Sequence, residues 1–193
     1  SALAFTVIIS RALLGYEPMN GLLKPSHFAD LGKLMFAFVM LWAYFNFSQF
    51  LLTYAANLVE EIPYMLTRLH NGWQYLALFL VVFHFAGPWL LLLSRDTKRT
   101  PHRLVVIAGW LLVMRFLDLF MMISPEFGAD GRNIHFEAGE HASHFFFHPL
   151  DLAAPLAIGG LWLWMFYTQL AQRPLFAVGD PYLRESLEST GGH

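Results

Sequence analysis

Two residues of opposite charge lie three positions apart inside an otherwise apolar stretch of the chain. Arg115 and Asp118 occur in LVVIAGWLLVMRFLDLFMMI, residues 104–123. Charged groups inside a bilayer are costly and usually face the protein interior in pairs. Residues at i and i+3 are neighbours on a helix, so the spacing predicts a charge-assisted pair. The pair is either a structural clamp or part of a proton route with Asp118 as the carrier. A carboxylate paired with arginine alone is a poor carrier, so the second interpretation needs further partners.

A histidine in a second apolar stretch is the first candidate partner. His84 is central in GWQYLALFLVVFHFAGPWLLLL, residues 72–93, and Pro88 follows four residues later. Proline has no N–H, so the carbonyl of His84 loses its usual helical donor, and the Gly87-Pro88 pair predicts a kink. The alternative is an ordinary proline kink beside a hydrogen-bonded interior histidine. Haem ligation is disfavoured, because the chain has no second histidine deep in an apolar segment.

Polar side chains follow a third apolar stretch, residues 31–56. Asn46, Gln49 and Thr53 share one helical stripe, while Tyr44 and Ser48 form a neighbouring i,i+4 pair. Such groups either order a water chain or form hydrogen bonds between helices.

Charged residues flank the two ends of this third stretch. Asp30 and Lys33 mark one end, and Glu60 and Glu61 mark the other. These carboxylates are the mouths of a proton route or, on the simpler interpretation, solvated helix caps.

Histidines cluster in HFEAGEHASHFFFHP, residues 135–149. The pattern i, i+4, i+7, i+11 would place them on one face of a helix with a glutamate, and both residue types bind zinc or copper. The four candidate ligands are Glu137, His141, His144 and His148. The spacing is unspecific, so a polar loop that docks a partner is the alternative and no metal is assigned.

The elements that must position these residues are membrane helices. The 193 residues are 56% hydrophobic and 13% charged, against about 25% charged in soluble domains. Spanning helices need roughly 20 mostly apolar residues. Four segments meet this length: 31–56, 72–93, 104–124 and 150–171. We therefore predict an all-α, polytopic transmembrane helix bundle with four full spans. Residues 1–15 resemble the end of a truncated fifth span.

The distribution of basic residues predicts the orientation of the bundle. If all segments span, nine of the twelve Lys and Arg residues fall on one side, which the positive-inside rule assigns to the cytoplasm. The tail 173–193 is then cytoplasmic and the loop 125–149 lies outside, so that 16–172 forms the membrane bundle.

Several classes of function are disfavoured by what the sequence lacks. There is no cysteine, which excludes thiolate chemistry and cysteine-held iron–sulfur clusters within this chain, and the net charge of −2 argues against nucleic acid as a partner. No Walker A, Gly-rich nucleotide, HExxH or GxSxG motif occurs.

Three blocks carry a resemblance to a known family. The segment HFADLGKLMFAFVMLWAYFNFSQFLLTYAANLVEEIPYMLTRLHNGWQ, the basic LLLSRDTKR loop and the RFLDLF helix are similar to the second NrfD-type membrane subunit of bacterial alternative complex III. The resemblance runs from about residue 26 to 181 and covers the C-terminal half of family chains, which have about ten spans.

The resemblance implies a role in a quinol-oxidising complex of the bacterial inner membrane. Haem c and iron–sulfur clusters would lie in partner subunits, namely multihaem cytochromes and an iron–sulfur protein, beside a sister NrfD-type subunit. The chain itself is expected to bind no cofactor, apart from a quinone at its surface.

Three functions follow as hypotheses. The first is a subunit with a proton path and a quinone-facing surface, built on His84, Arg115 and Asp118 with the flanking polar groups. The second is a purely structural anchor for the redox subunits. The third, a stand-alone transporter, is disfavoured by the resemblance.

Overall fold

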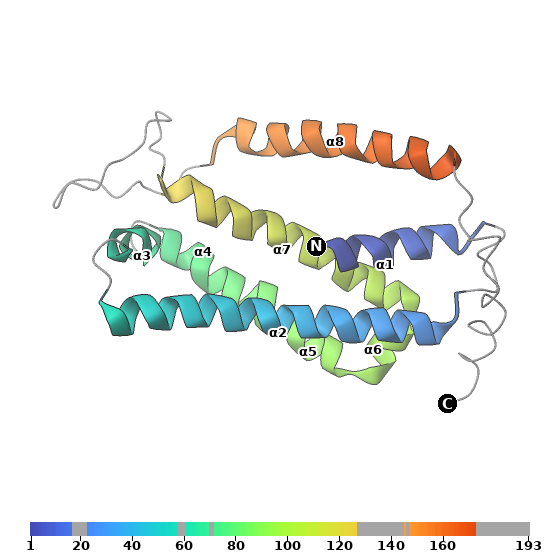
Figure 1. The fold of residues 1–193 in the computed structure, drawn as a ribbon, viewed down its shortest axis with the longest axis horizontal. Coiled ribbons are helices and arrows are strands. Elements are labelled where there is room, and N and C mark those ends of the chain that lie inside the picture. Colours follow the sequence, from blue (N-terminus) through green and yellow to red (C-terminus); the bar gives the residue numbers. More distant parts are fainter. Residues whose placement is uncertain (17–22, 58–60, 70–71, 127–144, 146, 173–193) are drawn as a thin grey trace. The chain divides into compact units, whose positions relative to one another are not determined.

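The computed structural model is helical throughout the part of the chain that it describes. It describes residues 1–16, 23–57, 61–69, 72–126, 145 and 147–172, and no strand occurs among them (Figure 1). Four helical stretches there are long and apolar enough to cross a membrane: Pro25–Ala56, Trp73–Leu93, Pro101–Ile123 and Pro149–Gln172. The chain is therefore an all-α polytopic protein, and each predicted apolar segment coincides with one of these stretches to within a few residues.

Residues 1–146 form one compact unit and residues 147–193 form a second. In the first unit, α1 (Ala2–Leu13) packs against α7 (Pro101–Ile123), and α2 (Pro25–Ala56) packs against the second span. The short helices are α3 (Ile62–Leu69), α6 (Arg95–Arg99) and the 3-10 turn η2 (Ser124–Glu126).

Helix α2 begins six residues before the predicted apolar segment. Pro25 occupies its first turn, where the missing N–H costs nothing, and the Lys24 backbone N–H donates to His27 Nδ1 at 3.2 Å. The helix ends at Asn57, whose φ of 49° is left-handed. Its 32 residues span about 48 Å, more than the roughly 30 Å hydrocarbon layer, so its polar first turn lies outside the apolar segment.

The second span contains a π-helical turn where the sequence predicted a simple proline kink. It is built from α4 (Trp73–Leu80), the π-helix η1 (Val81–Ala86) and α5 (Gly87–Leu93). The Gly87 N–H donates to Val82 O, five residues back instead of four. Phe83 O therefore loses its α-helical donor, and the next residue, Pro88, has no N–H.

A side chain of another helix takes the place of that donor. Trp110 Nε1 in α7 donates to Phe83 O at 2.8 Å. A backbone carbonyl at membrane depth must find a partner inside the protein. The hydrogen bond from the neighbouring helix therefore falls on Phe83, one residue before the carbonyl at which the sequence predicted a missing helical donor.

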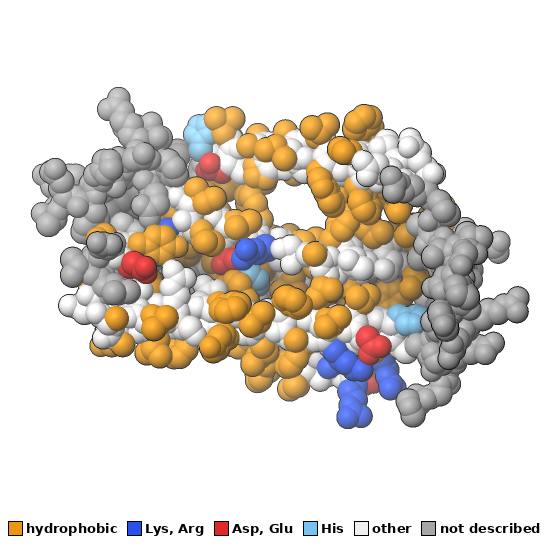
Figure 2. Space-filling model, in the orientation of Figure 1, with side chains coloured by type: hydrophobic (Ala, Val, Ile, Leu, Met, Phe, Trp, Pro, Cys, Tyr) orange, Lys and Arg blue, Asp and Glu red, His pale blue; other side chains and the backbone are white. Residues whose placement is uncertain are grey.

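Two apolar clusters form the core of the first unit. The larger joins α1, α2, α5 and α7 and includes Val7, Phe28, Met35, Leu92, Leu104 and Ala108. The smaller joins α4 and α7 through Trp73, Leu80, Phe120 and Met121. Along α7 the charged pair lies between these clusters. Large apolar side chains are also exposed along α2 and α5, as Figure 2 shows, which fits a surface that faces lipid or other subunits.

The second unit contains α8 (Pro149–Gln172), which has no buried residue. Asp151 Oδ2 accepts a hydrogen bond from the His148 backbone N–H at 2.8 Å, and His148 Nδ1 accepts one from the Leu150 N–H at 3.2 Å. Asp151 therefore caps the first turn, the role that its position beside the positive end of the helix dipole predicts.

Candidate functional site

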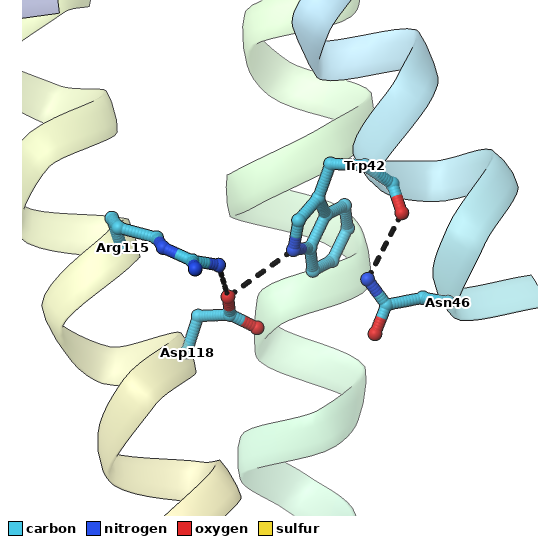
Figure 3. A network of polar contacts seen from close by, with 4 residues as sticks. All are labelled: Trp42, Asn46, Arg115 and Asp118. Atoms are coloured by element: carbon cyan, nitrogen blue, oxygen red, sulfur yellow. Dashed lines mark hydrogen bonds and ion pairs between the residues drawn. The ribbon is translucent and has the colours of Figure 1, made fainter. Parts of the chain in front are cut away.

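The Arg115–Asp118 pair predicted from the sequence is present, and Trp42 of α2 joins it. Arg115 Nη1 donates to Asp118 Oδ2, and Trp42 Nε1 donates to the same oxygen at 3.2 Å (Figure 3). Asn46 Nδ2 donates to Trp42 O at 2.9 Å, one turn further along α2. Asp118 is only 7% exposed, whereas the side chain of Arg115 is 37% exposed. The carboxylate is thus the buried partner and connects α7 to α2.

His84 is the second residue that contacts the side chain of Trp42. The centroids of the two rings are 4.3 Å apart with the planes tilted by 35°, and His84 is 6% exposed. Its Nδ1 is buried and has no hydrogen-bond partner among the residues that the structure describes. π-Helical turns in α-helices frequently occur at functional sites, and His84 lies within η1. Trp42 therefore contacts both the carboxylate and the imidazole that the sequence placed in one set.

Two cavities meet at this group. The first, of about 580 Å³, lies between α1, α2, η1 and α7, and the second, of about 530 Å³, extends toward α3. Only the first is lined by His84 and Arg115, and only the second by Arg68 and Tyr64. Both cavities are lined by Trp42, Asn46, Gln49, Asp118 and Met122. Asp118 is therefore accessible from two cavities of a size that holds water or a small ligand.

Arg68 is a second buried charged residue, and it was not among the site residues predicted from the sequence. It is 7% exposed and lies in α3. Nη1 donates to Tyr64 O at 2.7 Å, Nη2 donates to Met122 O at 2.6 Å, and the guanidinium lies 3.3 Å from the centre of the Tyr64 ring. Arg68 thus fastens α3 to the end of α7 and forms the far wall of the second cavity.

The polar stripe of α2 continues from the pair toward the C-terminal end of that helix. Asn46 and Gln49 line both cavities, and Thr53, only 4% exposed, donates to Glu61 Oε2 at 3.3 Å. Asn46, Gln49 and Asp118 thus share both cavities, while Thr53 and Glu61 form a separate pair further along that lines neither of them. Glu60 lies outside the described residues.

Three predicted site residues lie elsewhere. Tyr44 is 63% exposed and packs against Phe45, and neither Tyr44 nor Ser48 lines the two cavities. Asp30 is exposed and pairs with Lys33 at 2.8 Å, one turn away on the same helix. Buried apolar residues of the larger cluster, among them Met35, Val39, Ile107 and Leu111, lie along α2 and α7 between the positions of Asp30 and Asp118.

The metal candidates of the loop 125–149 are mostly untested. Glu137, His141 and His144 lie outside the described residues, and His148 bonds at the start of α8. Within the described ranges, no group of three His, Cys, Asp or Glu residues could hold a metal ion.

Asp118 and His84 contact the same indole, and because Arg115 stabilises the ionised carboxylate, any proton exchange at Asp118 depends on partners such as this imidazole. Asp118 has a compensating cation, and the adjacent His84 has a free ring nitrogen among the described groups.

Trp42 was missed by the sequence analysis because an indole in an apolar run resembles any other core or lipid-facing aromatic. The only local signal was its position one turn before Asn46 on the polar stripe.

Neither a protein-family model nor a curated protein matches the chain.

Proposed function

We propose that the chain is a membrane subunit of a quinol-oxidising electron-transfer complex similar to alternative complex III, and that Asp118 exchanges protons in it. On this proposal the redox centres are haem c and iron–sulfur clusters in partner subunits, including multihaem cytochromes, an iron–sulfur protein and a sister NrfD-type subunit. The complex lies in the bacterial inner membrane with the C-terminus of this chain in the cytoplasm. The sequence blocks around residues 27–74, 91–99 and 115–120 support this assignment.

The observation that carries the proton role is the environment of Asp118. A carboxylate that is 7% exposed inside an apolar bundle lines two cavities, beside a histidine with an unbonded ring nitrogen among the described groups. Ionisable residues within spans commonly mark proton relays. A purely structural ion pair needs neither the cavities nor the imidazole.

The polar groups extend from Asp118 in one direction along α2. Gln49 lines both cavities, and the hydrogen-bonded pair of Thr53 and Glu61 lies further toward the C-terminal end of α2, while the larger apolar cluster occupies the opposite half. With the proposed orientation, protons reach Asp118 from the outer side through the second cavity. A quinone-facing surface would then lie along the apolar walls of the same cavities.

The experiment is a measurement of protons translocated per electron in the reconstituted complex carrying Asp118→Asn. We expect the ratio to fall while the complex assembles and oxidises quinol, because asparagine accepts the Trp42 hydrogen bond but carries no exchangeable acid. Asp30→Asn is the matched control, since Asp30 is an exposed carboxylate of α2 paired with Lys33. An unchanged ratio in an assembled Asp118→Asn complex would refute the proton role.

A second function, that of a structural anchor, is favoured by the connections of the same pair. Arg115, Asp118 and Trp42 join α7 to α2, and Arg68 joins α3 to α7. An anchor predicts that Arg115→Leu prevents assembly because it leaves a buried charge uncompensated. It also predicts that Asp118→Asn assembles with an unchanged proton ratio. The proton ratio of the assembled Asp118→Asn complex therefore separates the two functions.

A further inference from the structure

Basic side chains gather where the second span turns into α7. Arg95, Lys98 and Arg99 lie in α6, and Arg103 follows in the first turn of α7. Residues at i, i+3 and i+4 share one face of a helix, so the three α6 cations lie side by side. Figure 2 shows Lys and Arg side chains grouped in this region. Two acidic groups lie nearby, Asp96 in α6 and Asp30, which is paired with Lys33. The net charge of this surface remains positive.

The basic turn is held in a fixed place against α2. A Cβ atom on Gly32 would lie 2.8 Å from Lys98 Cγ and 3.3 Å from Leu104 Cδ1, so the absence of a side chain at Gly32 permits this close approach. The Lys98 ammonium lies 5.5 Å from the centre of the Phe36 ring. The stem of Lys98 thus packs on α2 while its charge stays near the surface. This packing fixes α6 against α2 at Lys98, and the exposed Arg95, Arg99 and Arg103 surround that point.

An exposed apolar surface begins directly beside these cations. Leu90, Leu91 and Leu93 of α5 are 59%, 54% and 57% exposed, and they precede Arg95 by two to five residues. A soluble acidic protein could neutralise the cations but would not cover a leucine surface inside the bilayer. A phospholipid with a negatively charged head group matches both parts, because its phosphate meets the cations and its acyl chains meet the leucines.

We propose that Arg95, Lys98, Arg99 and Arg103 bind the head group of an anionic phospholipid whose acyl chains lie along α5. The site is independent of Asp118 and of the proposed proton role. It exceeds a general preference of basic loops for one side of the membrane, because it predicts that one class of lipid stays bound to the solubilised protein.

The test is native mass spectrometry of the full chain in mild detergent with equal amounts of phosphatidylglycerol and phosphatidylcholine. The natural sequence should retain phosphatidylglycerol in preference. In the triple variant Arg95→Gln, Arg99→Gln, Arg103→Gln, each arginine removed should reduce the preference for phosphatidylglycerol roughly fivefold. The triple lysine variant at the same positions should keep most of it. Added salt should weaken the preference, and inorganic phosphate should leave the lipid bound.

Two glycine variants separate the position of the cations from their charge. Gly32→Val should reduce lipid retention because it displaces Lys98, whereas Gly109→Val should not, since a Cβ at Gly109 meets no atom within 4 Å. A photoreactive residue at Thr100 in native membranes should capture phospholipid. The proposal fails if the triple glutamine variant keeps the lipid preference, if phosphate displaces the lipid, or if Thr100 captures an acidic protein instead.

Discussion

At residue scale, Trp42 performs two tasks with different parts of one side chain. Its N–H donates to Asp118, and its ring contacts His84. The spacing of Arg115 and Asp118 was enough to predict their pairing, because neighbours on one helix are fixed by local geometry. The partners from other helices, Trp42 and Arg68, could not be predicted, because the arrangement of helices in space decides which residues meet.

Replacement of Trp42 by phenylalanine tests the first of these tasks. The variant keeps an aromatic ring for His84 and removes the donor to Asp118, a hydrogen bond to a charged group worth about 1.5–3 kcal/mol. We expect the free energy of unfolding in detergent to fall by about that amount. Trp164→Phe, at a 66% exposed position of α8, is the control and should change it little. Equal effects of the two variants would show that the Trp42 hydrogen bond contributes no stability.

At the scale of the element, the second span shows why a proline signal in a sequence is ambiguous. Gly87-Pro88 indicated a disturbance correctly, but a kink and a π-helical turn both accommodate a missing N–H. The choice depends on whether a neighbour can bond the carbonyl that is left over. Here Trp110 of α7 bonds Phe83 O, which is a tertiary contact and leaves no trace in the local sequence.

A double-mutant cycle measures this compensation. Trp110→Phe alone should destabilise the protein by about 1–3 kcal/mol, because Phe83 O is left without its donor. In a Pro88→Ala background the new N–H can bond Phe83 O, so the same substitution should cost clearly less. Thermal unfolding of the four proteins gives the coupling energy. Additive effects would contradict the assignment of Trp110 as the substitute donor.

At the scale of the whole molecule, the spans were predictable because membrane thickness sets a minimum apolar length. The four predicted segments fall within helices or differ at their ends by a few residues, chiefly where the polar first turn of α2 precedes its apolar part. The two interpretations of the flanking carboxylates, as mouths of a proton route or as solvated caps, stay predictions. Asp30 pairs with Lys33 on the same helix, a contact that local spacing predicts, whereas the apolar cluster beside it arises from helices packed together from distant parts of the chain.

The orientation can be tested directly, because the chain has no cysteine and single cysteines give no background. With the proposed topology, a membrane-impermeant maleimide should label Glu61→Cys and His148→Cys in intact cells. Arg99→Cys should react only after permeabilisation. The reverse pattern would invert the orientation. Labelling of Glu61→Cys and Arg99→Cys from the same side would contradict the one span between them, Trp73–Leu93.

Asp118 lies closer to the Ile123 end of α7 than to its Pro101 end, and this position has an electrical consequence. It lies five residues before the end of the helix at Ile123, about 8 Å of a hydrocarbon layer of about 30 Å. The apolar cluster occupies the longer part on the other side. On the proposed function, a proton that enters from the Glu61 end and stops at Asp118 crosses about a quarter of the membrane voltage. Moving one charge across the whole membrane is worth about 2.3 kcal/mol per 100 mV. The free energy of proton binding at Asp118 would therefore change by about 0.6 kcal/mol per 100 mV. The larger share of the electrical work would belong to the step through the apolar cluster.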